Sequence, residues 1–172
     1  MDSILKIEDL TVEVGDRVIL KDLSLQIPFS KTLVLFGPNG SGKSTLIKAI
    51  MGFENYAVTG GRIVYGGEPI NSLSTDERAQ KGIGVLFQNP PKVRGIKLRQ
   101  MVELVSHRPA QEDPYVDKLN VGELMDRDLN VNFSGGEMKR SELLQVLSQK
   151  PKLLLLDEPE SGVDLENIKI IG

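Results

Sequence analysis

The sequence predicts an α/β protein with a mainly parallel sheet, an antiparallel N-terminal β portion and an inserted helical subdomain. Apolar runs typical of buried strands alternate with helical patterns, which is the signature of a parallel sheet with helices packed on its faces. A hairpin pattern opens the chain, and helical spacing dominates residues 89–148. A chain of 172 residues with 40% hydrophobic content is long enough for one domain with a core.

The N-terminal third predicts a hairpin, a buried strand and a helix, in that order. Apolar residues alternate along residues 4–14 and 18–27 on either side of a tight turn, as in two paired strands. Residues 32–36 are continuously apolar, which is typical of a strand buried on both faces. Helical spacing follows over residues 43–51, and Gly52 ends that helix.

The middle of the chain continues the alternation of strands and helices. Residues 62–65 predict a strand that stops at two glycines. Residues 74–77, Ser-Thr-Asp-Glu, have the form of a capping box that opens a short helix ending at Gly82. Residues 83–87 then predict another buried strand, which Gln88 closes.

The remainder predicts the helical subdomain and one last strand. Residues 96–105 have helical spacing, and Asp113-Pro114 is a good start for a second helix. Ser134 and Glu137 form another possible capping box before a leucine-rich helix. Residues 153–156, four leucines, predict a buried strand. We therefore expect a single domain over 1–172, with a nucleotide-binding core formed by 1–88 and 149–172 and a helical subdomain at 89–148.

Composition excludes several classes of function. The formal charge is −3, from 21 Lys and Arg against 24 Asp and Glu, so no concentrated basic face for nucleic acid is expected. The pair Lys139-Arg140 is interpreted as part of a solvated helix face. The chain has no cysteine, which excludes disulfides and thiolate metal sites. Neither a leader pattern nor an apolar stretch of membrane-spanning length is present, so the sequence predicts a cytoplasmic protein.

Residues 37–44 match the phosphate-loop pattern G-x-x-x-x-G-K-[ST], between a predicted buried strand and a predicted helix. Glycines let backbone N–H groups turn inward around phosphates, and the helix N-terminus adds partial positive charge. We expect Lys43 to reach the outer phosphates and Ser44 to offer its hydroxyl to Mg²⁺. A glycine-rich turn that binds nothing is the alternative. The residues expected to hold ATP are Gly37, Pro38, Asn39, Gly40, Ser41, Gly42, Lys43, Ser44 and Thr45.

Two carboxylates follow the last predicted strand. Asp157, at the end of the leucine run, is expected to hold Mg²⁺ through water beside Ser44. Glu158 points elsewhere and is the candidate to orient or deprotonate the attacking water. Many buried strands end in acidic residues for structural reasons, and the phosphate loop is what favours the catalytic interpretation.

The segment Phe133-Ser134-Gly135-Gly136-Glu137, ahead of the leucine-rich strand with its Asp-Glu pair, resembles the signature of the ATP-binding-cassette (ABC) family of P-loop ATPases. The resemblance spans essentially the whole chain. It implies that the signature residues Ser134, Gly135, Gly136 and Glu137 cap an ATP held by a second ABC ATPase subunit, so that two domains sandwich two nucleotides head to tail. A well-capped helix without a ligand is the alternative.

Two further loops carry the same resemblance. Gln88 resembles the family glutamine that senses Mg²⁺ and the γ-phosphate. It is therefore a metal candidate with Ser44 and Asp157, and a catalytic candidate with Lys43 and Glu158. The segment at 161–164, Ser-Gly-Val-Asp, resembles the family D-loop.

Within the family, residues 130–142 most resemble the SufC branch, soluble ATPases of iron–sulfur cluster assembly. Glu137 stands where transporters mostly carry Gln, and Val14 stands where many members carry an aromatic residue against adenine. This resemblance implies partners like the scaffold proteins SufB and SufD, docked through the Gln88 region and the helices after it. The ATPase subunit of a membrane transporter, bound to permease subunits, is the alternative. A chromosome-maintenance ATPase is disfavoured by the short insert.

Relative to the family, we expect the C-terminal part of the domain to be absent from this chain, including the family's switch histidine, which follows the strand after the D-loop. A nucleotide-binding fragment that does not hydrolyse ATP is therefore a third hypothesis. His107, the single histidine, is expected to be a surface or helix-terminal residue without a catalytic or metal role.

Overall fold

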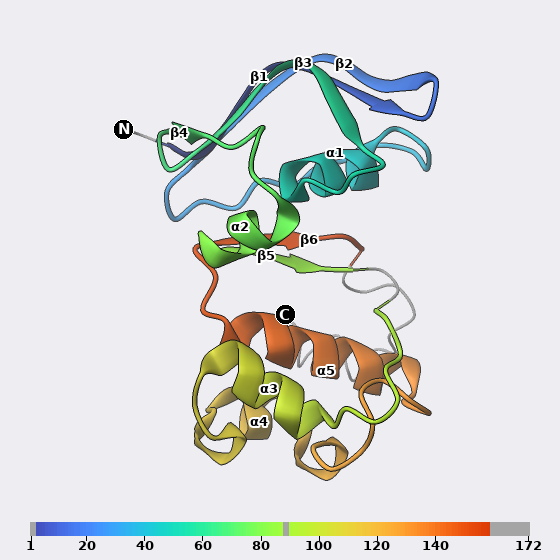
Figure 1. Ribbon diagram of the computed structural model, residues 1–172, viewed down its shortest axis with the longest axis vertical. Helices are drawn as coiled ribbons and strands as arrows, with labels where there is room; N and C mark the ends of the chain where they lie inside the picture. The colour runs from blue at the N-terminus through green and yellow to red at the C-terminus, as the bar shows by residue number, and fades with distance from the viewer. Residues whose placement is uncertain (1–2, 88–89, 159–172) are drawn as a thin grey trace. The chain divides into compact units, whose positions relative to one another are not determined.

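The computed structural model describes residues 3–87 and 90–158, so Gln88 and the predicted D-loop lie outside the described residues. The chain forms two compact units, residues 1–83 and 84–172 (Figure 1). Each unit has its own secondary structure and its own buried side chains. The predicted division into a core and an 89–148 subdomain stays a prediction.

The first unit contains a four-stranded sheet and two helices. In chain order its elements are β1 (Ser3–Val14), β2 (Arg17–Pro28), α1 (Lys43–Met51), β3 (Ala57–Tyr65), β4 (Glu68–Pro69) and α2 (Thr75–Gln80). The strand order is β2-β1-β3-β4, and every neighbouring pair is antiparallel. The predicted N-terminal hairpin is confirmed, with Val14 paired to Arg17 across the turn.

A bulge in β1 keeps its apolar side chains on one face. Leu5 and Ile7 are buried, and so are Leu10 and Val12. The first pair is at odd positions and the second at even positions, so in a regular strand the two pairs would face opposite sides. The pairing register shifts between them, and Asp9 has a φ of 48° there. Because an extra residue in one strand reverses the alternation of side chains, both pairs face the core.

Helix α1 covers the sheet with an apolar stripe and ends as the sequence predicts. Its buried residues are Leu46, Ile47, Ala49, Ile50 and Met51. Gly52 adopts the left-handed conformation with a φ of 76° and donates its N–H to the carbonyl of Ala49. A glycine suits this position because other residues are strained there.

The buried strand predicted over residues 32–36 is not observed. The chain has no regular secondary structure from 31 to 38, and Phe36 is 91% exposed. A continuous apolar run indicates burial, but a strand also needs neighbours for its ladder, and no described ladder includes this segment. The prediction is therefore wrong for this segment.

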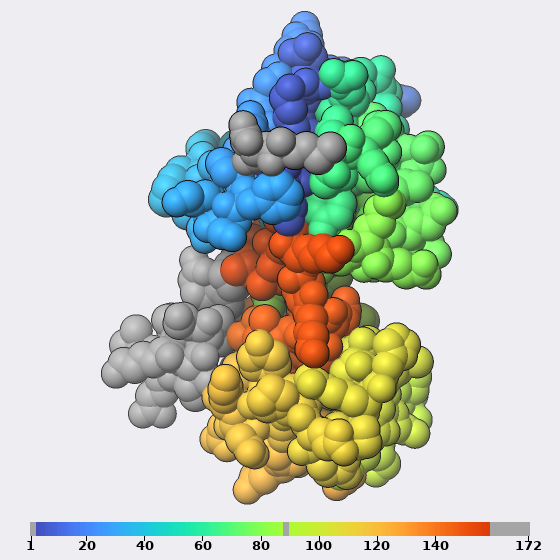
Figure 2. Space-filling model, turned by 90° about the vertical axis from the view of Figure 1, so that its left-hand side faces the viewer, coloured from blue at the N-terminus to red at the C-terminus, as the bar shows by residue number. Residues whose placement is uncertain are grey.

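The second unit contains a two-stranded sheet and a helical cluster. The elements, from the unit boundary onward, are β5 (Ile83–Leu86), α3 (Leu98–Ser106), η1 (Ala110–Glu112), α4 (Tyr115–Lys118), η2 (Gly122–Leu124), α5 (Gly135–Ser148) and β6 (Leu153–Leu156). Strand β6 pairs with β5. The space-filling view shows the residues around α4 and η2, in yellow, packed closely together (Figure 2).

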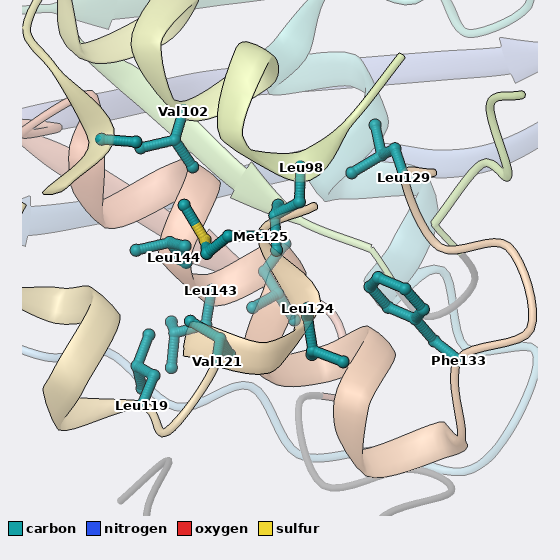
Figure 3. Close-up of a cluster of buried hydrophobic side chains, with 12 residues drawn as sticks. Leu98, Val102, Leu119, Val121, Leu124, Met125, Leu129, Phe133, Leu143 and Leu144 are labelled. Carbon is teal, nitrogen blue, oxygen red and sulfur yellow. The ribbon is translucent and has the colours of Figure 1, made fainter. Parts of the chain in front are cut away.

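The core of the second unit lies between α3, α4 and α5 (Figure 3). Leu98 and Val102 come from α3, while Leu143 and Leu144 come from α5. Phe133, just before α5, is 6% exposed and belongs to the same cluster. The residue before the signature serine therefore anchors that loop to the core.

Both predicted capping boxes are confirmed. Ser74 caps α2 with Glu77, and Ser134 caps α5 with Glu137, each through reciprocal side-chain and backbone hydrogen bonds. His107 ends α3 in the left-handed conformation with its side chain exposed, which confirms its helix-terminal position. No helix among the described residues is long and apolar enough to cross a bilayer.

Candidate functional site

The predicted phosphate loop leads directly into α1. The N–H of Ser41 donates to the carbonyl of Pro38 over 3.2 Å, which closes a turn, and α1 begins at Lys43. The ammonium of Lys43 donates to the carbonyls of Gly37 over 2.7 Å and Pro38 over 3.0 Å. The lysine thus folds back over its own loop, and the first-turn N–H groups of a helix have no partner within the helix.

At two glycines of this loop, a side chain would require neighbouring atoms to shift. Gly42 has a φ of 95°, and a Cβ there would lie 2.5 Å from Cδ2 of Leu20 in β2. A Cβ at Gly37 would lie 2.7 Å from Oγ of Ser41. The loop is therefore a small backbone cradle backed by β2. Such a cradle fits the phosphates of a nucleotide, whose oxygens accept hydrogen bonds from backbone N–H groups.

Val14, predicted to face adenine, ends β1 and is partly buried. It lies two residues beyond Val12, which pairs with Leu20, the residue that backs Gly42. Val14 and the phosphate loop thus belong to the same unit and are linked through one pair of strands. Contact with an adenine ring stays a prediction.

The signature residues come together at the N-terminus of α5. The carboxylate of Glu137 accepts the N–H of Ser134 over 2.7 Å, and the hydroxyl of Ser134 accepts the N–H of Glu137 over 3.2 Å. The hydrogen bond from the Ser134 N–H to the carboxylate, together with the Ser134 hydroxyl and the nearby positive charge of Arg127, lowers the pKa of Glu137. Ser134 and Gly135 are exposed, so the capped helix end is accessible to a ligand.

Arg127 supports this loop from behind. Its guanidinium lies 3.4 Å from Glu137, donates to the carbonyl of Asn132 over 2.7 Å and lies 4.7 Å from the ring centre of Phe133. Arg127 thus contacts Asn132, Phe133 and Glu137, which lie before and within the first turn of α5. The signature loop is therefore held by contacts on both sides of its serine.

Asp157 and Glu158 lie at the end of β6 in the second unit. The N–H of Asp157 donates to the carbonyl of Leu86 over 3.1 Å, and Asp157 is 8% exposed. Glu158 has a φ of 49°, so the chain turns directly after the strand. The two consecutive carboxylates follow the predicted strand end, as the sequence suggested.

The described site residues are thus divided between the two units. The phosphate loop and Val14 belong to the first unit, the signature and the acidic pair belong to the second, and Gln88 lies outside the described residues. The proximity of Ser44 to Asp157 around Mg²⁺ stays a prediction. Among the residues that the structure describes, no cluster of three or more His, Asp or Glu side chains suggests another metal site.

The interpretation of Lys139 as part of a solvated helix face is wrong. Lys139 and Glu142 are 3% and 5% exposed, and both contact the backbone of Phe87. Spacing along the helix could have revealed this, because Lys139 and Glu142 share an i, i+3, i+4, i+7 face with Leu143 and Val146. Sequence reasoning noted the apolar members of that face and missed its two charged ones.

Comparison with known proteins decides the family. The family model described as ABC transporter matches residues 20–161, a span that contains the phosphate loop, the signature and the acidic pair. The chain belongs to the ABC ATPase family. The structural comparison confirms the α/β fold class of P-loop type.

Two curated relatives with different names are similar to this ABC ATPase. The "Probable ATP-dependent transporter SufC" of Escherichia coli (strain K12) is 37% identical over 98% of this chain and 74% of its own length. A "Probable ABC transporter ATP-binding protein" of Streptococcus pyogenes serotype M3 is 39% identical over 99% of this chain and 72% of its own length. The chain resembles the two to nearly the same degree.

Solved structures confirm the fold at similar coverage. An ATP-binding cassette of an ABC transporter, described in its ADP conformation, matches with a TM-score of 0.80 and 25% identity over 99% of this chain and 74% of its own. The cbiO1 protein from Clostridium perfringens, part of an ABC transporter complex, matches with a TM-score of 0.76 and 29% identity over 99% of this chain and 71% of its own.

Proposed function

We propose that this chain binds and hydrolyses Mg·ATP and that ATP drives its head-to-tail pairing with a second ABC ATPase subunit. The observation that carries the proposal is the glycine cradle of residues 37–42 ahead of α1. The exposed, capped N-terminus of α5 supports the pairing, because a helix N-terminus with Ser134 and Gly135 accessible suits the phosphates of a nucleotide held by a partner.

Each predicted residue has one task in this proposal. Lys43 leaves the carbonyls of its own loop to hold the outer phosphates, since an ammonium bonds more strongly to phosphate than to a neutral carbonyl. Ser44, Asp157 and Gln88 hold Mg²⁺, which when bound neutralises charge on the β- and γ-phosphates. Glu158 orients the attacking water or takes its proton.

We infer a SufC-like role in iron–sulfur cluster assembly, with SufB- and SufD-like scaffolds as partners and a cytoplasmic location. Supporting observations are the signature with Glu137 and the Escherichia coli SufC relative. The alternative is an ATP-binding subunit that docks on membrane permeases, which the Streptococcus pyogenes relative supports. Co-purification from native cells distinguishes these roles, because soluble scaffold proteins and integral permeases separate on detergent-free extraction.

The chemistry is tested by following mass with light scattering and phosphate release with and without Glu158→Gln. We expect the unmodified chain to release phosphate and the Glu158→Gln variant to dimerise stably on Mg·ATP, because ATP that is not hydrolysed keeps the pair closed. Lys43→Ala is the matched control, which should neither dimerise nor release phosphate. If both the unmodified and the Glu158→Gln chains bind ATP yet stay monomeric and inactive, the proposal is wrong and the chain is a nucleotide-binding fragment.

A further inference from the structure

The backbone at the end of β5 is held by side chains of α5. The last ladder bond of β5 runs from the N–H of Asp157 to the carbonyl of Leu86. At the next residue, Phe87, the N–H donates to Oε1 of Glu142 over 2.6 Å, and the carbonyl accepts a hydrogen bond from Nζ of Lys139. Both polar groups of one residue are thus bound by side chains that are 52 and 55 positions away in the sequence.

The two side chains are buried as an ion pair in a position that stability alone does not require. Nζ of Lys139 lies 3.7 Å from Oε2 of Glu142, and the two side chains are 4% and 7% exposed. That Oε2 atom accepts no hydrogen bond from the described residues, and burial raises the pKa of Glu142. Well-packed apolar residues are often at least as stable as a buried pair, so the hydrogen bonds of this pair to the Phe87 backbone are its distinguishing contribution.

The chain is held again at Pro91, two residues after Asn89. Nδ2 of Asn130 donates to the carbonyl of Pro91 over 2.8 Å, and Asn130 is 1% exposed. Residues 87 and 91, on either side of 88–89, are therefore both bound by side chains from 130–142. That stretch contains the signature loop and the first half of α5.

We infer that Glu142 and Lys139 are positioning residues that fix the backbone of Phe87, the residue before Gln88, to the helix whose N-terminus carries the signature. The inference rests on the proposed function, in which Gln88 contacts Mg²⁺ and the γ-phosphate. Lys139 lies five residues after Ser134, about 7.5 Å along the helix axis. A displacement of α5 would therefore be transmitted to the Phe87 peptide through these two bonds.

The test replaces the pair without emptying the core. The double variant Lys139→Met/Glu142→Leu keeps the side-chain volumes and removes both bonds to Phe87. Gln145→Leu is the matched control on the same helix, because the Gln145 amide donates only to Ser141 within α5. Amide hydrogen exchange by NMR reports on Phe87 directly and requires no hydrolysis.

We expect exchange of the Phe87 amide to accelerate at least about tenfold in the double variant, while the Leu144 amide and the control variant stay unchanged. Unchanged exchange at Phe87 overturns the inference, whatever the ATPase activity. Acceleration at both Phe87 and Leu144 shows general loosening of α5 and also overturns it.

The kinetic arm uses Gln88→Ala in a mutant cycle. We expect the double variant to lower kcat about 10- to 100-fold, with the Kd for ATP within about threefold of the unmodified value. Adding Gln88→Ala to the double variant should lower kcat by less than about a further twofold, because both sets of substitutions remove the same contribution of Gln88 to catalysis. Fully additive losses, or no loss in kcat, overturn the positioning role. If the unmodified chain releases no phosphate, the proposed function fails and the exchange measurement alone decides the inference.

Discussion

Replacing Arg78 with methionine tests how the phosphate-loop helix is held in place. Arg78 is 2% exposed, although it is a charged residue of the short helix α2. Its guanidinium donates to the carbonyls of Ala49 over 2.9 Å and Ile50 over 2.8 Å, which lie in the last turn of α1. It also donates to the carbonyls of Leu73 over 2.9 Å and Asn71 over 3.1 Å.

The expected loss follows from these four hydrogen bonds. At a net value of about 1 kcal/mol each they sum to about 4 kcal/mol. Methionine fills part of the space, and water can reach some of the freed carbonyls, so we expect a decrease of about 3 kcal/mol in the free energy of unfolding of the first unit. A cation at the C-terminus of α1 also interacts favourably with the helix dipole, which makes this figure conservative.

Urea unfolding followed by far-ultraviolet circular dichroism measures this change. The matched control is Arg62→Met, which removes a guanidinium that is 65% exposed and paired with Glu8 on the sheet surface. Exposed pairs contribute little, so the control should unfold at nearly the same urea concentration as the unmodified chain. A loss below about 1 kcal/mol for Arg78→Met would refute the view that its backbone contacts stabilise α1.

Three further predictions test other parts of the molecule. Lys43→Ala should lower ATP affinity about 10- to 100-fold, because charge-assisted hydrogen bonds are worth about 1.5–3 kcal/mol. Equilibrium dialysis measures this affinity. The urea midpoint of the variant should not change, and an unfolded variant would show a structural role for Lys43 instead. The pKa of Glu137 is lowered below its ordinary value of 4.5, so its contribution to stability is complete above that pH and is lost as the pH falls through the lower folded pKa. The stability difference between the unmodified chain and Glu137→Gln should therefore shrink between pH 7 and pH 3, and a constant difference would contradict this cause. Gly61→Ala should destabilise by about 2 kcal/mol or more, because φ is 72° and its Cβ would lie 2.3 Å from the carbonyl oxygen of Glu8; Gly66→Ala, with open space around it, is the control and should cost clearly less.

Elements specified by neighbouring residues were predictable from the sequence. The helix over Lys43–Met51 and the strand over Leu153–Leu156 have the predicted bounds, and both Ser-x-x-Glu capping boxes form. The cause is local: a cap is completed within four residues, and a glycine such as Gly52 ends a helix through its own conformation. The phosphate loop belongs to this class, since its glycines, turn and lysine lie within seven residues.

Elements that depend on distant partners were predicted less well. The apolar run at 32–36 has the composition of a buried strand, but ladder partners are not encoded in the run itself. Strand β3 begins at Ala57, five residues before the predicted start. The two glycines at 60–61 indicate the end of a strand when the local sequence is considered alone, but pairing with β1 extends β3 through them. Tertiary pairing overrides local propensity in both cases.

The same distinction separates the candidate site residues. The phosphate loop is completed by contacts within residues 37–43 and the backing strand, and the signature is completed by Ser134, Glu137 and Arg127. The chain on either side of 88–89 is different, because its backbone is held over 39 to 55 residues of sequence, by Asn130 at one end and by the buried pair of α5 at the other. Substitutions inside α5, far from any nucleotide contact, should therefore alter the Gln88 segment while leaving ATP binding at the phosphate loop intact.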